Sequence, residues 1–344
     1  MVGAVAALFV APACGGLAGD GGGGNAATSE QDGVTKMEIT VTHWPSLLYG
    51  VPYMVAMEKG YFEEAGLEIT GIIGSEGGGT TVRNVLTGGL PMGEVATPGA
   101  VQAAEAGGEI AIVAGGVAGI DEINWVTEKD SDVNSIEDLD GKKVAFSEPG
   151  SVTEALINLS LDRAGIDVDN VDLIAAGGIT EGLTALEGGG VDAAANLEPV
   201  FSAEGGEDTW NVVFEPIEFV PAFQQTVILA SPKLIEENPE AITAFLTARQ
   251  RGIEFIQDNI EETATIYAEY SELPKKATLS ALEAIDLESY YTTGLNIDGL
   301  TAVQEEMELL GLIEEGKTAP WDELINQDFL PEGTEEIDPA SIGG

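Results

Sequence analysis

Hydrophobic positions along the chain follow two spacings, which predict strands interleaved with helices. Residues 36–42 alternate apolar and polar side chains and are rich in β-branched residues, as in a half-buried strand. Residues 152–164 and 241–258 repeat apolar positions at helical spacing instead. The other predicted strands are 67–73, 93–96, 109–114, 142–146, 171–175, 191–195, 211–214 and 225–230, and the other helices are 51–59, 81–86, 97–106, 179–186, 261–270, 276–287 and 299–310. Repeated strand–helix–strand units predict an α/β fold with a largely parallel sheet.

The order of these elements predicts two lobes. The strand–helix pattern runs once to about residue 119, begins again, and gives way after residue 238 to an almost entirely helical stretch. We therefore expect lobe 1 to comprise residues 36–119 plus 226–344, and an inserted lobe 2 to comprise residues 120–225. Two strands would cross between the lobes and form a hinge. Ligands in open α/β sheets bind at the carboxyl ends of strands, which places the candidate site between the lobes.

Residues 1–35 have a different composition from the rest of the chain. An apolar run at 1–12 is too short to span a bilayer as a helix and matches the core of an export signal. Small residues and Cys14 follow, and then a glycine-rich linker at 15–33. This order resembles a lipoprotein signal, so we expect an exported protein, at the cell surface or in the periplasm, anchored through lipidated Cys14. The alternative is a plain secretory leader with an incidental cysteine.

The amino-acid composition restricts the partners and the kinds of site that the chain can have. Hydrophobic residues make up 44% of the 344 residues, which is ample for packed cores. The chain has 60 acidic and 13 basic residues, which gives a net charge of -47. Such a surface repels nucleic acid and is typical of proteins that stay soluble in concentrated salt. One cysteine and one histidine, His43, exclude a zinc site of the Cys/His type. We expect no metal and no cofactor.

Five segments in order resemble a known family. They are 51–69 (VPYMVAMEKGYFEEAGLEI), 77–93 (GGGTTVRNVLTGGLPMG), 135–146 (SIEDLDGKKVAF), 183–199 (LTALEGGGVDAAANLEP) and 239–259. The chain resembles the sulfonate, taurine and nitrate binding proteins, a family that also includes binding proteins for thiamine-type pyrimidine precursors. The resemblance implies a two-lobed type II periplasmic-binding-protein fold, no enzymatic activity, and a monomer that delivers a small molecule to the permease and ATPase subunits of an ABC importer.

Three predicted loops precede helices and should face the cleft. Their candidate ligand-binding residues are Gly79, Thr80, Thr81, Thr97, Gly150, Ser151 and Thr153. Backbone N–H groups at helix starts, together with the helix dipole, suit sulfonate, carboxylate or nitrate oxygens. The alternative is that the hydroxyls only cap helices and the glycines only permit the turns.

Other candidates lie at strand ends. Trp44 would stack on a flat ligand or simply pack within its loop, which also carries the weaker candidates Ser46 and Tyr49. Asn196 and Glu198 follow another predicted strand. The Glu198 carboxylate suits a ligand amine, or alternatively only favours a helix start. Gln224 and Gln225 lie on the return crossing, from which they would reach the cleft.

These residues predict the extracellular solute-binding component of an ABC importer for a sulfonate, a taurine-like molecule or a related nitrogen or sulfur compound. The scarcity of arginine favours a zwitterion or a neutral ring over a bare anion. An alternative ligand is a thiamine-type pyrimidine precursor or another neutral heterocycle. An alternative of another class is an enzyme on the same fold, although no pair of carboxylates stands out as an acid–base pair.

Overall fold

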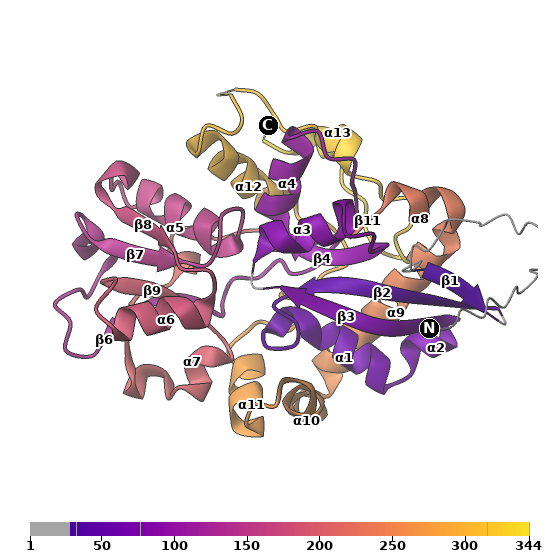
Figure 1. Cartoon of the computed structure of the whole chain (residues 1–344), viewed down its shortest axis with the longest axis horizontal. Helices are drawn as coiled ribbons and strands as arrows, with labels where there is room; N and C mark the ends of the chain where they lie inside the picture. Colours follow the sequence, from indigo (N-terminus) through magenta and orange to yellow (C-terminus); the bar gives the residue numbers. More distant parts are fainter. Residues whose placement is uncertain (1–27, 32, 76, 315, 344) are drawn as a thin grey trace, which may run out of the picture.

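The computed structural model describes residues 28–31, 33–75, 77–314 and 316–343, which form two β-sheets flanked by helices (Figure 1). The first sheet has the order β1-β2-β4-β11-β5, with β3 beside β2. Its strands are β1 (Thr28–Gln31), β2 (Val34–Thr42), β3 (Leu67–Ser75), β4 (Met92–Ala96), β5 (Ala111–Gly115) and β11 (Thr226–Ala230). The second sheet has the order β10-β6-β9-β7-β8. Its strands are β6 (Ile123–Glu128), β7 (Lys143–Phe146), β8 (Asp172–Ala175), β9 (Ala193–Leu197) and β10 (Trp210–Phe214).

Both sheets are mixed, so the expectation of a largely parallel sheet was wrong. β2 runs parallel to β3 and β4, whereas β11 runs antiparallel to β4 and β5. Likewise β7 runs parallel to β8 and β9, whereas β6 runs antiparallel to β9 and β10. β6 and β11 are the strands that arrive directly from the other sheet. They have no preceding crossover helix in their own sheet, and so they are free of the parallel direction that βαβ units impose.

Helices cover both sheets and supply the C-terminal region. They are α1 (Val51–Glu58), α2 (Tyr61–Glu64), α3 (Gly78–Leu86), α4 (Thr97–Glu105), α5 (Val152–Arg163), α6 (Ile179–Glu187), α7 (Val200–Ala203), α8 (Pro232–Glu237), α9 (Pro239–Asp258), α10 (Ile260–Ser271), α11 (Lys275–Glu283), α12 (Ile297–Leu309) and α13 (Trp321–Leu324). The apolar stripe of α9 is buried and packs against α1, as helical periodicity predicts. The helix expected at 276–287 ends early, at Glu283.

The folded part of the chain begins before the predicted end of the linker. β1 pairs with β2 as an antiparallel ribbon, with Thr28 opposite Met37 and Gln31 opposite Val34. The prediction of a leader and linker through residue 35 was therefore wrong for the strand residues at its end. The apolar run and Cys14 lie outside the described residues. In the ranges that the structure describes, no helix is both long and apolar enough to cross a membrane.

Two chain segments connect the sheets and run side by side. One leads from β5 to β6 and the other returns from β10 to β11. The Gly116 amide donates to the Thr226 carbonyl at 3.0 Å, and the Thr226 amide donates to the Val117 carbonyl at 3.2 Å. This is the pair of crossing strands expected for the two-lobed fold.

The C-terminal helices contact both halves of the molecule. α12 packs against α4 and also against α5, where Arg163 and Glu305 form an ion pair at 2.5 Å. α11 packs against α7. Figure 1 shows both helices on the side of the first sheet that faces the second. Because these contacts join the two halves, the assignment of residues 226–344 to lobe 1 stays a prediction.

Candidate ligand-binding cleft

A narrow cavity lies between the strand ends of the two sheets. The space between its lining atoms is about 280 Å³ when the open mouth is counted, and the enclosed part has room for about one water molecule. The lining residues from the first half are Thr42, His43, Tyr49, Gly78 and Ala96, and those from the second half are Ser147, Ser151, Val152, Thr153, Ile179 and Leu197. The cavity therefore sits where parallel strands of both sheets end, as expected for an α/β binding site.

Four helix N-termini converge on this cavity. Gly78 and Ile179 are the first residues of α3 and α6, Ala96 is the N-cap of α4, and Ser151 is the N-cap of α5. The first backbone N–H groups of a helix have no intrahelical acceptor, and the helix dipole is positive at that end. The arrangement therefore favours an acceptor-rich or anionic group on a ligand.

Three linked hydroxyls form the wall contributed by β7 and α5. The Oγ atoms of Ser147 and Ser151 lie 2.8 and 3.0 Å from Thr153 Oγ1, and the Ser147 amide donates to Thr153 Oγ1 at 3.0 Å. Ser151 also caps α5, because its Oγ accepts from the Glu154 amide at 3.1 Å. Capping and lining the cavity are thus compatible roles for one residue. Ligand contact by Ser151 and Thr153 stays a prediction. Ser147 was not among the predicted site residues, although it directly follows β7.

The opposite wall contains a chain of buried polar groups. Tyr49 Oη donates to Gln225 Oε1 at 2.8 Å, and Gln225 Nε2 donates to Glu122 Oε1 at 2.9 Å and to the Gly119 carbonyl. Tyr290 Oη donates to Glu122 Oε1 at 2.6 Å, and Glu122 Oε2 has no hydrogen-bond partner among the described residues. Burial raises the pKa of Glu122 to about 7, against the lowering effect of its hydrogen bonds from Tyr290 and Gln225.

Sequence reasoning missed the central member of this chain. Glu122 was not proposed, and Tyr49 was ranked below Trp44. Of the two crossing glutamines, Gln225 bonds to the lining residue Tyr49 without lining the cavity itself, whereas Gln224 is engaged elsewhere. Its amide donates to the carbonyls of Val117 and Thr226 at 3.1 and 2.9 Å, and it accepts from the Asn296 amide at 3.1 Å. Gln224 therefore ties the crossing segments together and is not among the lining residues.

Several predicted residues of the first half are occupied by structural contacts. The Thr81 hydroxyl bonds with Ser75 and donates to the Gly77 carbonyl, four residues earlier in the chain. The glycine loop expected at 77–80 is in fact the first turn of this helix, which begins at Gly78. The Thr80 hydroxyl accepts from Arg83 at 2.7 Å. Both hydroxyls therefore have local partners, but neither caps α3, which has no side-chain cap. Ligand contact by Thr80 and Thr81 stays a prediction.

The loop after β2 is held by tyrosines. Trp44 packs edge-on against Tyr270, with ring centroids 5.9 Å apart, and lies outside the cavity lining. Ser46 is exposed, and its carbonyl accepts from Tyr267 at 2.7 Å. The Leu48 carbonyl accepts from Tyr291 at 2.9 Å. The loop is therefore fixed from outside the cavity.

Two predicted residues carry buried polar atoms without partners. Thr97 Oγ1 and Asn196 Nδ2 have no hydrogen-bond partner among the described residues. An unpaired buried polar group costs free energy, so both positions favour a further polar partner. Glu198 instead accepts from the Ser202 amide and hydroxyl at 3.2 and 2.8 Å. Burial raises the pKa of this carboxyl.

The two halves meet closely at glycine backbone. A Cβ atom at Gly78 would lie 2.5 Å from the Gly150 carbonyl oxygen, and one at Gly99 would lie 3.0 Å from it. Gly150 itself has a φ of 75°, in the left-handed region that favours glycine. A Cβ at Gly79 would make only ordinary contacts, at 3.4 Å or more. The predicted residue Gly150 therefore lies at the cleft rim, where its carbonyl oxygen packs closely against Gly78 and not against Gly79.

Two mixed α/β halves, two crossing segments and a cleft between the strand ends define the architecture of a periplasmic-type solute-binding protein. The family model described as NMT1/THI5 like matches residues 49–263, more than half of the chain. The chain belongs to this NMT1/THI5-like family, as the sequence resemblance had indicated.

Relatives and solved structures agree with this assignment. The chain is 26% identical over 246 residues to the formylaminopyrimidine-binding protein of Halalkalibacterium halodurans, covering 69% of this chain and 71% of that protein. It is 23% identical over 283 residues to a putative aliphatic sulfonates-binding protein of Bacillus subtilis, covering 81% and 80%.

The fold matches the periplasmic aliphatic sulphonate binding protein SsuA of Escherichia coli with a TM-score of 0.70 at 18% identity, over 87% of this chain and 94% of that one. The periplasmic nitrate-binding protein NrtA of Synechocystis PCC 6803 gives a TM-score of 0.70 at 15% identity, over 86% and 87%. At these identities the structures share the fold, and the ligand is a separate question.

Proposed function

We propose that this chain is the solute-binding component of an ABC importer, and that it captures a small molecule with an acceptor-rich head group between its lobes. The proposal rests on one observation, the convergence of four helix N-termini and three buried hydroxyls on a single cavity. Sulfonate, carboxylate and similar oxygens are the groups that such donors hold. The relatives named above, which are binding proteins, support the same reading.

The charge of the cleft narrows the ligand further. The lining residues include no lysine and no arginine. An oxyanion would be held there by N–H and O–H groups alone, in a protein with a net charge of -47. A taurine-like zwitterion carries its own cation and reduces this repulsion, so we favour it over nitrate or sulfate.

A flat heterocycle is the second candidate, because the rings of His43 and Tyr49 stack at the cavity wall. Their centroids are 6.0 Å apart with an interplanar angle of 28°. Such a pair suits a pyrimidine ring. The relative that binds formylaminopyrimidine supports this alternative.

We further propose that the protein binds its ligand without chemical turnover, is exported, and acts as a monomer with a permease and an ATPase. Anchoring would occur through lipidated Cys14, with residues 1–13 removed. Metabolic labelling with a radioactive fatty acid tests this point. Label is expected on the native chain and should be absent from Cys14→Ser.

Thermal unfolding in concentrated salt tests the ligand class. The panel is taurine, alkanesulfonates, nitrate, bicarbonate, the thiamine pyrimidine and riboflavin, with sulfate at equal ionic strength as the control. A ligand at 100 times its Kd adds about 2.7 kcal/mol of stability, which raises Tm by several degrees. A shift with taurine or a sulfonate supports the first candidate, and a shift with the pyrimidine alone supports the second. Turnover of any compound contradicts the binding-protein proposal.

A further inference from the structure

The amide of Gln225 can adopt only one orientation. Its Nε2 faces two acceptors, Glu122 Oε1 at 2.9 Å and the carbonyl of Gly119. Turning the amide over would place oxygen against oxygen at both contacts. Gln225 is fully buried, so no solvent compensates such a repulsion. Its Oε1 must therefore face Tyr49.

Tyr49 is consequently committed as a donor. Its hydroxyl lies 2.8 Å from Gln225 Oε1, an atom that can only accept. A tyrosine hydroxyl has a single proton. With that proton given to Gln225, the Tyr49 oxygen has only lone pairs to offer a molecule in the cavity that this residue lines.

Glu122 determines which groups donate and which accept along the hydrogen bonds that link it through Gln225 to Tyr49. Both Gln225 and Tyr290 donate to its Oε1, at 2.9 and 2.6 Å, while Oε2 has no partner among the described residues. A proton on this carboxyl would therefore sit on Oε2, and Oε1 accepts in either charge state. The other ionisable groups that interact with Glu122 are Asp121, Tyr49, Tyr267 and Tyr291. None of these is a cation that would reverse the direction.

The hydroxyl wall has the opposite character. Ser147, Ser151 and Thr153 carry three hydroxyl protons, and the two contacts to Thr153 Oγ1 use two of them. One hydroxyl proton remains for a ligand whichever way the two bonds run. The start of α5 adds backbone donors on the same side. One wall of the cavity thus donates, and Tyr49 on the other wall accepts.

We propose that Glu122 and Gln225 act as positioning residues that make Tyr49 an obligate acceptor, and that the cleft therefore selects ligands bearing an N–H donor opposite their acceptor group. The inference rests on the proposed function and narrows its ligand class. Small zwitterions and amino-substituted heterocycles fit this polarity. Simple alkanesulfonates and nitrate bring no donor to the lone pairs of the Tyr49 oxygen, which keeps only its bond to Gln225.

Matched probe pairs test the proposal by isothermal titration calorimetry. Taurine is compared with ethanesulfonate, and 4-amino-2-methylpyrimidine with 2,4-dimethylpyrimidine. The donor-bearing member of at least one pair should bind about tenfold or more tightly, because a buried polar group otherwise loses its partner. In Tyr49→Phe this ratio should fall to near one. The ratio is informative because general damage to the fold weakens both members equally.

Glu122→Gln provides a second variant, since a glutamine at this position can present either oxygen or nitrogen to Gln225. Its ratio should fall partway, whereas Thr265→Ala, at an exposed position of α10, should keep the native ratio. Equal binding of both members by the native protein overturns the inference and leaves the importer function standing. A native preference that survives in Tyr49→Phe overturns the role of Tyr49. Failure of all four probes to bind overturns the proposed ligand class and this inference together.

Discussion

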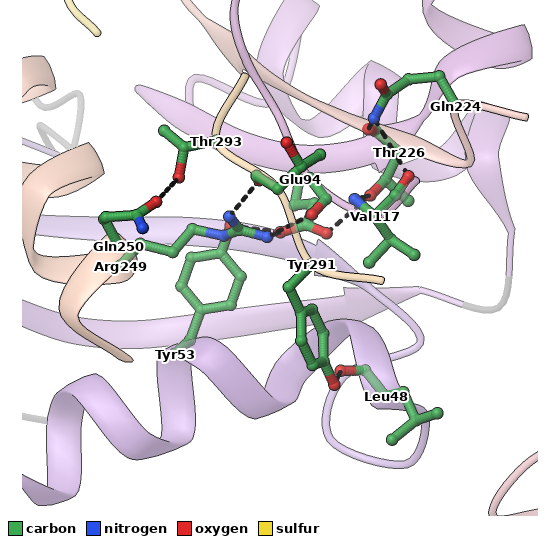
Figure 2. Close-up of polar contacts among 12 residues, drawn as sticks. Leu48, Tyr53, Glu94, Val117, Gln224, Thr226, Arg249, Gln250, Tyr291 and Thr293 are labelled. Atoms are coloured by element: carbon green, nitrogen blue, oxygen red, sulfur yellow. Dashed lines mark hydrogen bonds and ion pairs between the residues drawn. The ribbon is translucent and has the colours of Figure 1, made fainter. Parts of the chain in front are cut away.

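The crossing segments and the cleft rim are two of the regions where the halves of the molecule meet, and they differ in kind. At the crossing segments, Arg249 Nη2 lies 3.1 Å from Glu94 Oε2 and donates to the Gly116 carbonyl at 2.9 Å (Figure 2). Glu94 also accepts from Tyr53 at 2.6 Å and from Thr226 at 2.7 Å. The side chains of Arg249 and Glu94 are fully buried.

At the cleft rim, in contrast, the glycine backbone at Gly78 and Gly99 rests against the Gly150 carbonyl. Separating these surfaces breaks van der Waals contact, whereas disturbing the crossing side exposes or orphans a buried ion pair. The comparison teaches that the two contacts serve different purposes. The buried ion pair holds the crossing segment to the first sheet, and we expect the cleft rim to be the contact that separates if the halves move about the crossing segments, as in a hinged binding protein.

The largest expected effect is on the crossing side. Arg249→Met leaves the Glu94 carboxylate buried without its cation, which should cost about 3–5 kcal/mol of unfolding free energy. Arg251→Met, on the same helix, is the matched control. Its ion pair with Glu64, at 2.8 Å, is partly exposed and should cost at most about 1 kcal/mol. Denaturant unfolding in concentrated salt measures both. Similar losses of unfolding free energy in the two variants would show that the buried ion pair stabilises the fold no more than the exposed one does.

Glu122 bonds to Gln225 on the return crossing, and its titration predicts that the free energy of unfolding depends on pH. Folding raises its pKa from 4.5 to about 7, so the folded state holds this proton more tightly than the unfolded state. Stability from this group is therefore intact below pH 4.5 and declines as pH rises to about 7, by about 3 kcal/mol in total. Glu122→Gln should remove this contribution, measured by unfolding across the pH range.

Glu306, on α12, is a second buried carboxyl, and it should lower the stability over a wider pH range than Glu122 does. Both of its carboxyl oxygens lack a hydrogen-bond partner among the described residues, and burial raises its pKa to about 9, with a further rise from Glu154. The decline from Glu306 should continue to about pH 9 and disappear in Glu306→Gln. Because the Glu306 decline also covers pH 4.5 to 7, Glu122→Gln should make the decline in that window shallower without abolishing it. An unchanged slope between pH 4.5 and 7 in Glu122→Gln would place the titrating group elsewhere.

At the cleft rim, Gly78→Ala should weaken ligand binding by about tenfold or more, since closure would cost at least about 1.4 kcal/mol. A Cβ there lies 2.5 Å from both the Gly150 carbonyl oxygen and the Ala96 Cβ. Gly79→Ala is the adjacent control and should bind normally. Small-angle scattering should show a larger radius for Gly78→Ala alone. Normal affinity in that variant would mean that the halves need not touch here.

The smallest expected effect concerns the hydroxyl wall. Thr153→Val removes the hydroxyl that accepts from the Ser147 amide and bonds to both serine hydroxyls. We expect a loss of about 1–2 kcal/mol of stability and weaker ligand binding. Thr265→Val, whose exposed hydroxyl donates only to the Glu261 carbonyl at 3.0 Å, is the control. Unchanged ligand affinity in Thr153→Val would limit the cluster to a capping role.

Much of the fold could be predicted because it depends on local periodicity. The strand at 36–42 and the helix at 241–258 each carry an unambiguous apolar pattern, and both are present as β2 and α9. Ser151 could be proposed for the cleft because a hydroxyl before a helical pattern identifies an N-cap. The strand β6 was not predicted at all, and the direction of β11 was mispredicted, since direction depends on which sheet the chain enters.

The sequence by itself determined the class of protein, the order of its elements and the hydroxyl-bearing helix starts, because these depend on neighbours within a few residues. Only the tertiary structure decided which polar groups meet. Tyr49 and Gln225 are 176 residues apart, and Glu122 and Gln225 are 103 apart. No local pattern encodes such a pairing. It arises when two crossing segments fold against one wall of the cleft, where burial forces each donor to find an acceptor.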